Sequence, residues 1–96
     1  MSIAKGDLIV SLAGRDKDQL MFVLEQDGTY ALLVNGKSRR LENPKRKKLK
    51  HLRFAARIDS NVAMKIRSGD TVLNSELRRD LAIYGQNLTV RTKEDE

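Results

Sequence analysis

The sequence predicts a single, mainly β domain, a small barrel, followed by one or two short α-helices. Three observations predict it. Short apolar runs recur along the first half of the chain, and glycine-containing turn pairs separate them. Strands this short would leave exposed edges in a flat open sheet, which favours a barrel. After Arg57 the apolar spacing changes to the three-to-four-residue period of helices. A length of 96 residues suits one domain with one modest core.

Five short segments are the predicted strands. The pairs Asp27-Gly28 and Asn35-Gly36 are typical of type I′ hairpin turns, in which both central residues need a positive φ. They predict an antiparallel meander. Pro44 ends the fourth run because proline has no amide hydrogen to donate to a neighbouring strand. The predicted strands cover residues 7–13, 20–25, 29–34, 37–42 and 49–54. The apolar side chains expected in the core include Phe22, Tyr30, Leu52 and Phe54.

Two helices are predicted in the last third of the chain. Asp59 or Ser60 would cap a helix over residues 61–68, and Gly69 would end it. Asn74 or Ser75 would cap a second helix, which Gly85 would end. Such short helices need the barrel or a partner to pack against. The second helix carries an apolar stripe of Leu77, Leu81 and Tyr84.

These predictions divide the chain into two parts. Residues 1–57 would form the barrel, including a basic loop. Residues 58–96 would form a helical appendix that packs on the barrel and ends in a solvated acidic tail, Glu94-Asp95-Glu96. The sequence has no internal repeat, and no low-complexity linker separates the two parts. We therefore expect them to share one core.

Positive charge is concentrated in one block of the sequence. The net charge is +6, yet residues 37–57 hold ten Lys or Arg residues and a single acidic residue, Glu42. The rest of the chain carries nine basic and twelve acidic residues. Such segregation points to a polyanionic partner. A solvated charged loop and a patch for an acidic protein are the alternatives.

The densest part of the block follows the only proline of the chain. Pro44 restricts the backbone there, so we expect a charged loop that is attached to the barrel at both ends and binds phosphate groups. RNA is preferred over DNA, since no helix-turn-helix, zinc-finger or basic-zipper pattern is present to fill a DNA major groove. The candidate RNA-binding residues of the block are Arg39, Arg40, Lys45, Arg46, Lys47, Lys48, Lys50 and Arg53.

The segment from Gly6-Asp7 to Lys17 resembles a KOW motif: Gly-Asp, alternating apolar residues, a glycine, and basic residues before a second apolar strand. Together with the run Leu41-Glu42-Asn43-Pro44-Lys45-Arg46-Lys47-Lys48, it is similar to the small bacterial KOW-domain RNA-binding proteins. Those resemble KOW-type proteins of the large ribosomal subunit in archaea and eukaryotes. The resemblance covers residues 5–54 and implies an SH3-like barrel that contacts structured, usually ribosomal, RNA.

One position departs from the KOW pattern. The family often has glycine directly after the lysine, and this chain has Asp18. Aspartate tolerates the left-handed backbone better than most residues, so the turn can survive. Its negative charge weakens the case for phosphate contact by this loop. Arg15 and Lys17 are therefore candidate RNA-binding residues of lower rank than the basic block.

The sequence also argues against several classes of protein. There is no cysteine, and His51 is the single histidine, so neither a metal site nor a cofactor is expected. His51 also lacks a nucleophile to serve, and we expect no enzyme. No apolar run reaches the roughly 20 residues of a membrane span, and the N-terminus lacks the pattern of a signal peptide. We therefore expect a cytoplasmic protein with no membrane partner.

The expected function is non-catalytic binding of structured, ribosomal RNA, with ribosomal proteins as further candidate partners. Because aromatic residues make up only 4% of the chain, we expect recognition of RNA shape and backbone rather than base-by-base reading. The alternative is a protein-interaction module that binds a ribosomal or transcription-machinery protein through the apolar stripe of the second helix.

Overall fold

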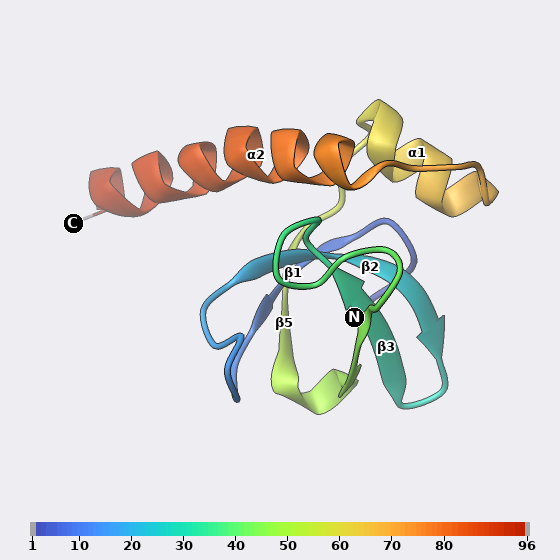
Figure 1. The fold of residues 1–96 in the computed structure, drawn as a ribbon. Coiled ribbons are helices and arrows are strands. Elements are labelled where there is room, and N and C mark those ends of the chain that lie inside the picture. The colour runs from blue at the N-terminus through green and yellow to red at the C-terminus, as the bar shows by residue number, and fades with distance from the viewer. Residues whose placement is uncertain (1, 96) are drawn as a thin grey trace.

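The computed structural model describes the backbone of residues 2–95 and the side chains of residues 2–86. It has a five-stranded antiparallel sheet and two α-helices, which confirms the prediction of a mainly β fold with C-terminal helices (Figure 1). In chain order the elements are β1 (Leu8–Ser11), β2 (Leu20–Asp27), β3 (Tyr30–Val34), β4 (Lys45–Lys48), the 3-10 turn η1 (Leu49–His51), β5 (Leu52–Ala56), α1 (Asn61–Ser68) and α2 (Asn74–Asp95).

The sheet curves strongly enough to bring its two edges together. Its strand order is β4-β3-β2-β1-β5, and only the three residues of η1 separate the edge strands β4 and β5. Backbone hydrogen bonds attach η1 to both sides of the sheet, from Leu49 N to Thr29 O (2.8 Å) and from Leu12 N to His51 O (2.9 Å). Register shifts within β1 and β2 add to the twist. The result is barrel-like.

Two apolar clusters lie on opposite faces of the sheet, as the alternation of side chains along a strand requires. The first cluster fills the concave interior of the sheet and contains Ile9, Met21, Val23, Ala31, Leu33 and Leu52. The second lies between the sheet and the helices and contains Leu8, Phe22, Val34, Val62, Ala63, Ile66 and Leu77. Figure 1 shows both helices on the same side of the barrel. The opposite end of the barrel, where η1 lies, is left uncovered by helices.

The first hairpin turn lies one residue later than predicted. Asp27 pairs with Tyr30, so the central residues of the turn are Gly28 and Thr29. Gly28 has a φ of 60°, whereas Thr29 has no positive φ, as in a type II′ rather than a type I′ turn.

The predicted strand over residues 37–42 is wrong. Asn35 accepts hydrogen bonds at its side-chain oxygen from the backbone N–H groups of Lys37 and Arg39, both at 2.9 Å, which curls this segment into a turn. The fourth strand instead begins immediately after Pro44, because the residues that follow it do have N–H groups to donate. The densest part of the basic block, Lys45–Lys48, is therefore a strand and not a loop.

Helix α1 matches its prediction. The Ser60 hydroxyl accepts a hydrogen bond from Ala63 N at 3.1 Å, which caps the first turn. Gly69 ends the helix in the left-handed conformation, with a φ of 81°. Both signals are local in sequence, and the contacts made by the rest of the fold do not override them.

Helix α2 differs from its prediction at both ends. The Asn74 side chain does not cap the helix, because its Oδ1 accepts from Leu41 N at 2.8 Å and so holds the segment between β3 and β4. The Glu76 carboxylate instead accepts from Leu73 N at 3.0 Å. The helix also continues past Gly85, which has no positive φ there and so does not end it.

The predicted acidic tail involves residues whose side chains lie outside the described part of the structure. Neither helix in the part of the chain that the structure describes is both long and apolar enough to cross a membrane.

Candidate nucleic-acid interface

The expected basic loop is an edge strand. The residues of β4 pair with β3 from Leu33 opposite Lys45 to Tyr30 opposite Lys48. Side chains alternate along the strand, so Lys45 and Lys47 are half-buried while the other two cations of β4 are exposed. An edge strand tolerates lysine because its outer side faces water. The four cations that the sequence presents as one group are therefore divided between two faces.

Lys47 points back into the barrel. Its ammonium donates to Ser11 Oγ at 2.7 Å and to Ala13 O at 2.5 Å, at the end of β1. Ser11 is fully buried. Since β4 and β1 are not neighbours in the sheet, this side chain joins two strands across the barrel. Lys47 is thus used to hold the fold, and its donors are not directed at solvent.

Arg39 and Arg40 are each paired with a carboxylate. Arg39 makes a two-pronged contact with Asp16, with Nη2 at 3.0 Å from Oδ2 and Nε at 3.2 Å from Oδ1. Asp16 is 3% exposed, so its charge would be costly to bury without this partner. Arg40 contacts Glu42 at 3.0 Å on the surface. A hydrogen bond from Asn74 and a further one from Arg40 lower the pKa of Glu42.

Arg46 lies over an aromatic ring. Its guanidinium carbon is 3.6 Å from the centroid of Tyr30, a cation–π distance. The prediction that Phe22 and Tyr30 both lie in the core is confirmed for Phe22, which is fully buried, and wrong for Tyr30, which is half-buried. Tyr30 lies on the opposite face of β3 from Ala31, whose side chain is in the barrel interior. Tyr30 directly precedes Ala31 in the strand, and adjacent side chains in a strand point to opposite faces. This alternation is the sequence signal that could have placed Tyr30 outside the barrel interior.

Several predicted cations have no carboxylate partner among the described residues. Three of them, Lys48, Lys50 and Arg53, are exposed and flank His51 on consecutive elements of the chain, β4, η1 and β5. Leu12 N bonds to His51 O, so the β1–β2 loop starts beside them. We call these three residues, together with Arg15 and Lys17 of that loop, the basic face. Lys45 also lacks such a partner but lies at the other end of β4.

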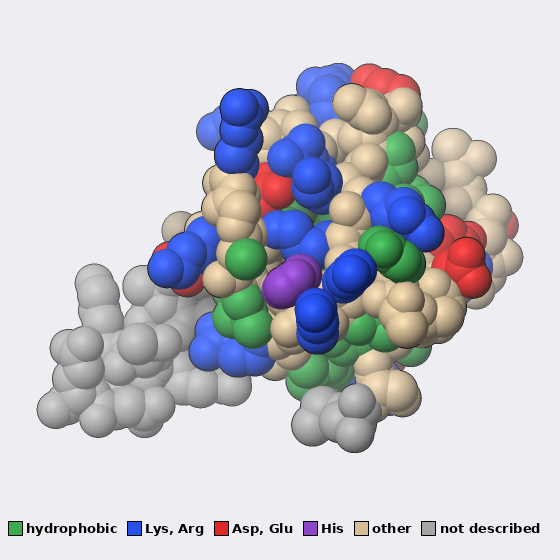
Figure 2. Space-filling model, turned by 90° about the horizontal axis from the view of Figure 1, so that it is seen from below, with side chains coloured by type: hydrophobic (Ala, Val, Ile, Leu, Met, Phe, Trp, Pro, Cys, Tyr) green, Lys and Arg blue, Asp and Glu red, His purple; other side chains and the backbone are tan. Residues whose placement is uncertain are grey.

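Figure 2 shows this end of the molecule, with Lys and Arg side chains gathered around the single histidine. It lies opposite the helices, so nothing in the described structure covers it (Figure 1).

Asp18 has a φ of 70°, which confirms that aspartate adopts the left-handed conformation where the KOW pattern often has glycine. Within the described residues, no three His, Asp or Glu side chains converge as a metal site would require.

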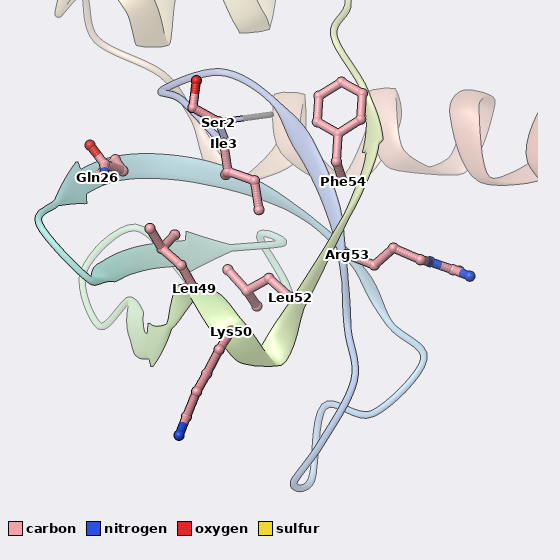
Figure 3. Close-up of a pocket in the computed structure, with 8 residues that line it drawn as sticks. All are labelled: Ser2, Ile3, Gln26, Leu49, Lys50, Leu52, Arg53 and Phe54. Atoms are coloured by element: carbon pink, nitrogen blue, oxygen red, sulfur yellow. The ribbon is translucent and has the colours of Figure 1, made fainter.

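An apolar cleft of about 660 Å³ opens beside the basic face. In Figure 3 the side chains of Ile3, Leu49 and Leu52 converge on it, while the ends of Lys50 and Arg53 point away in different directions. The cleft is lined by Ser2, Ile3, Gln26, Leu49, Lys50, Leu52, Arg53 and Phe54.

The two apolar residues predicted to face the core from β5 have different environments. Leu52 is 7% exposed and belongs to the interior cluster, as predicted. Phe54 is half-buried and is in neither of the two core clusters that the structure describes, so its predicted core position is wrong. Phe54 lines the cleft instead, and the guanidinium carbon of Arg57 lies 5.8 Å from the centroid of its ring.

An ion pair between buried Asp7 and exposed Arg57 holds that N-terminal segment in place. Asp7 is fully buried, and both of its oxygens accept from Arg57, at 2.9 Å each. Arg57 Nη2 also donates to Ser2 O at 3.2 Å, which fixes one wall of the cleft. The hydrogen bond with Asp7 raises the pKa of Arg57. The sequence does not predict this pair, and the Gly6-Asp7 start of the first apolar run is its one local signal.

Comparison of the chain with protein-family models and with curated protein sequences gives no match.

Proposed function

We propose that the protein binds structured RNA, without catalysis, by placing the basic face against the phosphate backbone. One observation carries this proposal: five exposed cations without a carboxylate partner among the described residues occupy one end of the barrel. Cations that serve only solubility would be interspersed with acidic residues, as Arg15 and Lys17 are in their loop, whereas residues 43–58, which hold Lys48, Lys50 and Arg53, contain no acidic residue. A gathered set is the electrostatic footprint of a polyanion-binding surface.

The arrangement suits an RNA backbone. Each lysine or arginine that meets a phosphate releases condensed counterions, which supplies affinity and makes it depend on salt. Arg15 and Arg53 can bind a phosphate through two parallel N–H groups, whereas Lys48 and Lys50 act as point charges. Because η1 and β5 belong to the hydrogen-bonded sheet, Lys50 and Arg53 are attached to a rigid backbone, which limits the entropy lost on binding.

The finer parts of the proposal rest on the resemblance to KOW-domain proteins over residues 5–54. We propose an SH3-like barrel of this type, ribosomal RNA as the ligand, and the cytoplasm as the place of action. A curved sheet of five antiparallel strands supports this reading of the fold. Ribosomal proteins would be neighbours of the bound molecule rather than its main ligand.

The protein-interaction alternative depends on a free apolar stripe on α2. Leu77 is fully buried in the cluster between sheet and helices, and Leu81 and Tyr84 pack against that cluster. This stripe is therefore covered by the molecule's own barrel. A partner would have to displace it, so RNA binding is the better supported of the two functions.

The experiment that tests the proposal compares two variants with the same net charge. Lys48→Gln/Lys50→Gln removes two cations of the basic face. Lys37→Gln/Arg79→Gln removes two exposed cations of the 35–39 turn and α2, which lie toward the helices. Fluorescence anisotropy with folded ribosomal RNA fragments would be measured over a series of salt concentrations.

We expect the Lys48→Gln/Lys50→Gln variant to bind more weakly and to lower the slope of log affinity against log salt by about 1 per lysine. The control variant should keep most of the parent's affinity and slope. Equal losses for the two variants would show a non-specific effect of net charge. If the parent bound none of the fragments at low salt, the proposal of RNA binding would be refuted.

A further inference from the structure

We propose that the apolar cleft beside the basic face accepts an unpaired base of the bound RNA. The preferred ligand would then be a duplex that carries a bulged or looped-out nucleotide, not a continuous helix. This inference rests on the proposed function and specifies the class of RNA.

The walls of the cleft suit a nucleobase. Ile3, Leu49 and Leu52 provide an apolar floor, and the Phe54 ring provides an aromatic surface that the described core clusters do not use (Figure 3). Proteins that read RNA bases usually stack them on such a ring. A volume of about 660 Å³ lies within the range of small-molecule sites.

The charges at the rim fit the two phosphates that flank an extruded base. Lys50 and Arg53 both line the cleft, yet their charged ends point away from its interior in different directions (Figure 3). A base that enters the cleft would leave its own phosphates outside, near these two cations. No acidic residue lines the cleft, so no repulsion opposes the approach of the backbone.

Gln26 supplies a polar group for the edge of the base. Its Nε2 donates to Gly28 O at 2.9 Å, which orients the side-chain amide. The Oε1 atom remains available to accept a hydrogen bond from a base N–H. Residues of this type bind bases through such amide contacts.

The second aromatic surface of the molecule is less suitable. Both rings have an arginine nearby, but the guanidinium carbon of Arg46 lies 3.6 Å from the Tyr30 centroid, whereas that of Arg57 lies 5.8 Å from the Phe54 centroid. The hollow around Arg46 and Tyr30 is also lined by Glu25 and Asp27, whose charges repel phosphate. Charge complementarity therefore favours the cleft over the Arg46–Tyr30 site. Tyr30 can serve as the control for Phe54, since both rings are half-buried and they lie on different surfaces.

The test uses two RNA hairpins. One carries a single bulged 2-aminopurine nucleotide, and the other has the same sequence without that nucleotide. Affinities of the full-length protein would be measured at one salt concentration, together with the fluorescence of 2-aminopurine. Phe54→Leu removes the ring, Ile3→Trp fills the cleft, and Tyr30→Leu is the control. Thermal unfolding of each variant would verify that it folds.

We expect the parent to bind the bulged hairpin about tenfold more tightly, the scale of one base–aromatic stacking contact. Phe54→Leu and Ile3→Trp should each reduce this preference and the fluorescence change, while Tyr30→Leu should keep both. The continuous hairpin can contact only the basic face. All three variants should therefore bind it with an affinity close to that of the parent.

Other outcomes overturn the inference in distinguishable ways. Equal affinity of the parent for both hairpins would leave RNA binding intact and show that no base enters the cleft, whose occupant would then be another apolar group, such as a protein side chain. If only Tyr30→Leu lost the preference for the bulged hairpin, the base would bind at the Arg46–Tyr30 site and not in the cleft. A parent that bound neither hairpin would refute the proposed function itself.

Discussion

Lys47 Nζ lies 2.7 Å from Ser11 Oγ and joins β4 to β1, two strands that are not neighbours in the sheet. The backbone hydrogen bonds leave the sheet open between its edges. This side chain spans the interior and limits how far β4 can move from the rest of the barrel. A residue in the middle of the most basic segment of the chain is therefore a structural residue.

Lys47→Met should destabilise the fold. Methionine keeps an unbranched apolar stem but leaves Ser11 Oγ and Ala13 O without the charged donor. Hydrogen bonds to charged groups are worth about 1.5–3 kcal/mol, and we expect a loss of free energy of unfolding of about that size in urea titrations. Lys48→Met, on the neighbouring exposed residue, should change stability by less than about 0.5 kcal/mol. Equal stabilities of the two variants would contradict the assigned role of Lys47.

Asp16 and Arg39 should show coupled effects on stability. Removal of Arg39 leaves a buried carboxylate without its partner, and removal of Asp16 leaves a partly buried guanidinium. We expect each single alanine variant to lose about 2 kcal/mol, below the roughly 3–5 kcal/mol of a fully buried pair because Arg39 is partly exposed.

A double-mutant cycle would measure their interaction, with an expected coupling of about 1–2 kcal/mol. Additive losses would show that the two side chains act independently. In RNA-binding assays Arg39→Ala should have less effect than Lys50→Ala, provided that both are compared at a temperature where the variants are folded.

Two glycines with positive φ should differ in their tolerance of alanine. Gly28 has a φ of 60° and open space around it, so Gly28→Ala should cost only the backbone penalty of about 1–2 kcal/mol. Gly36 has a φ of 77°, and an added Cβ would also collide with the backbone oxygen of Asn74 in α2. The Gly36 carbonyl accepts from Arg78 at 2.6 Å, so a shift would break that contact as well.

We therefore expect Gly36→Ala to be clearly more destabilising than Gly28→Ala in thermal unfolding. Both substitutions place alanine at a positive φ, but only Gly36→Ala adds a collision with α2. Similar melting temperatures for the two variants would show that α2 does not rest on the 35–39 turn as described.

The pH dependence of stability should include a contribution from Glu76. Hydrogen bonds from Lys65, and then from Leu73 N, lower its pKa below the ordinary value of 4.5. A carboxylate with a lowered folded-state pKa stabilises the protein above its unfolded-state pKa, and that contribution is lost as the pH falls through the lower folded-state value.

Glu76→Gln keeps an acceptor at this position but removes the titration. The variant should be less stable than the parent at pH 7, and the difference should shrink as the pH falls below about 4.5 and the parent's carboxylate gains its proton. Chemical unfolding at a series of pH values would measure this. A difference that stayed constant across the series would exclude Glu76 as the titrating group.

Much of the local structure could be predicted because its causes are local. The Ser60 cap and the Gly69 stop of α1 depend on residues within one turn, and the positive φ of Asp18 occurs at a residue type that tolerates it. The start of β4 was missed for a related reason. Asn35 curls the residues after it through its own side chain, and an Asn-Gly pair alone does not distinguish that turn from a hairpin.

The sequence by itself determined that positive charge is gathered in one block and that short strands precede two helices. Only the tertiary structure decided which of those charges are free. The partners Asp16 and Arg39 are 23 residues apart in sequence, and Ser11 and Lys47 are 36 apart. Whether such side chains meet depends on how the sheet curves and which strands lie across its interior. The composition of the chain and the spacing of its charged residues are the same whether a given side chain forms an ion pair, supports the fold or faces solvent. The role of each charge therefore follows from its three-dimensional neighbours.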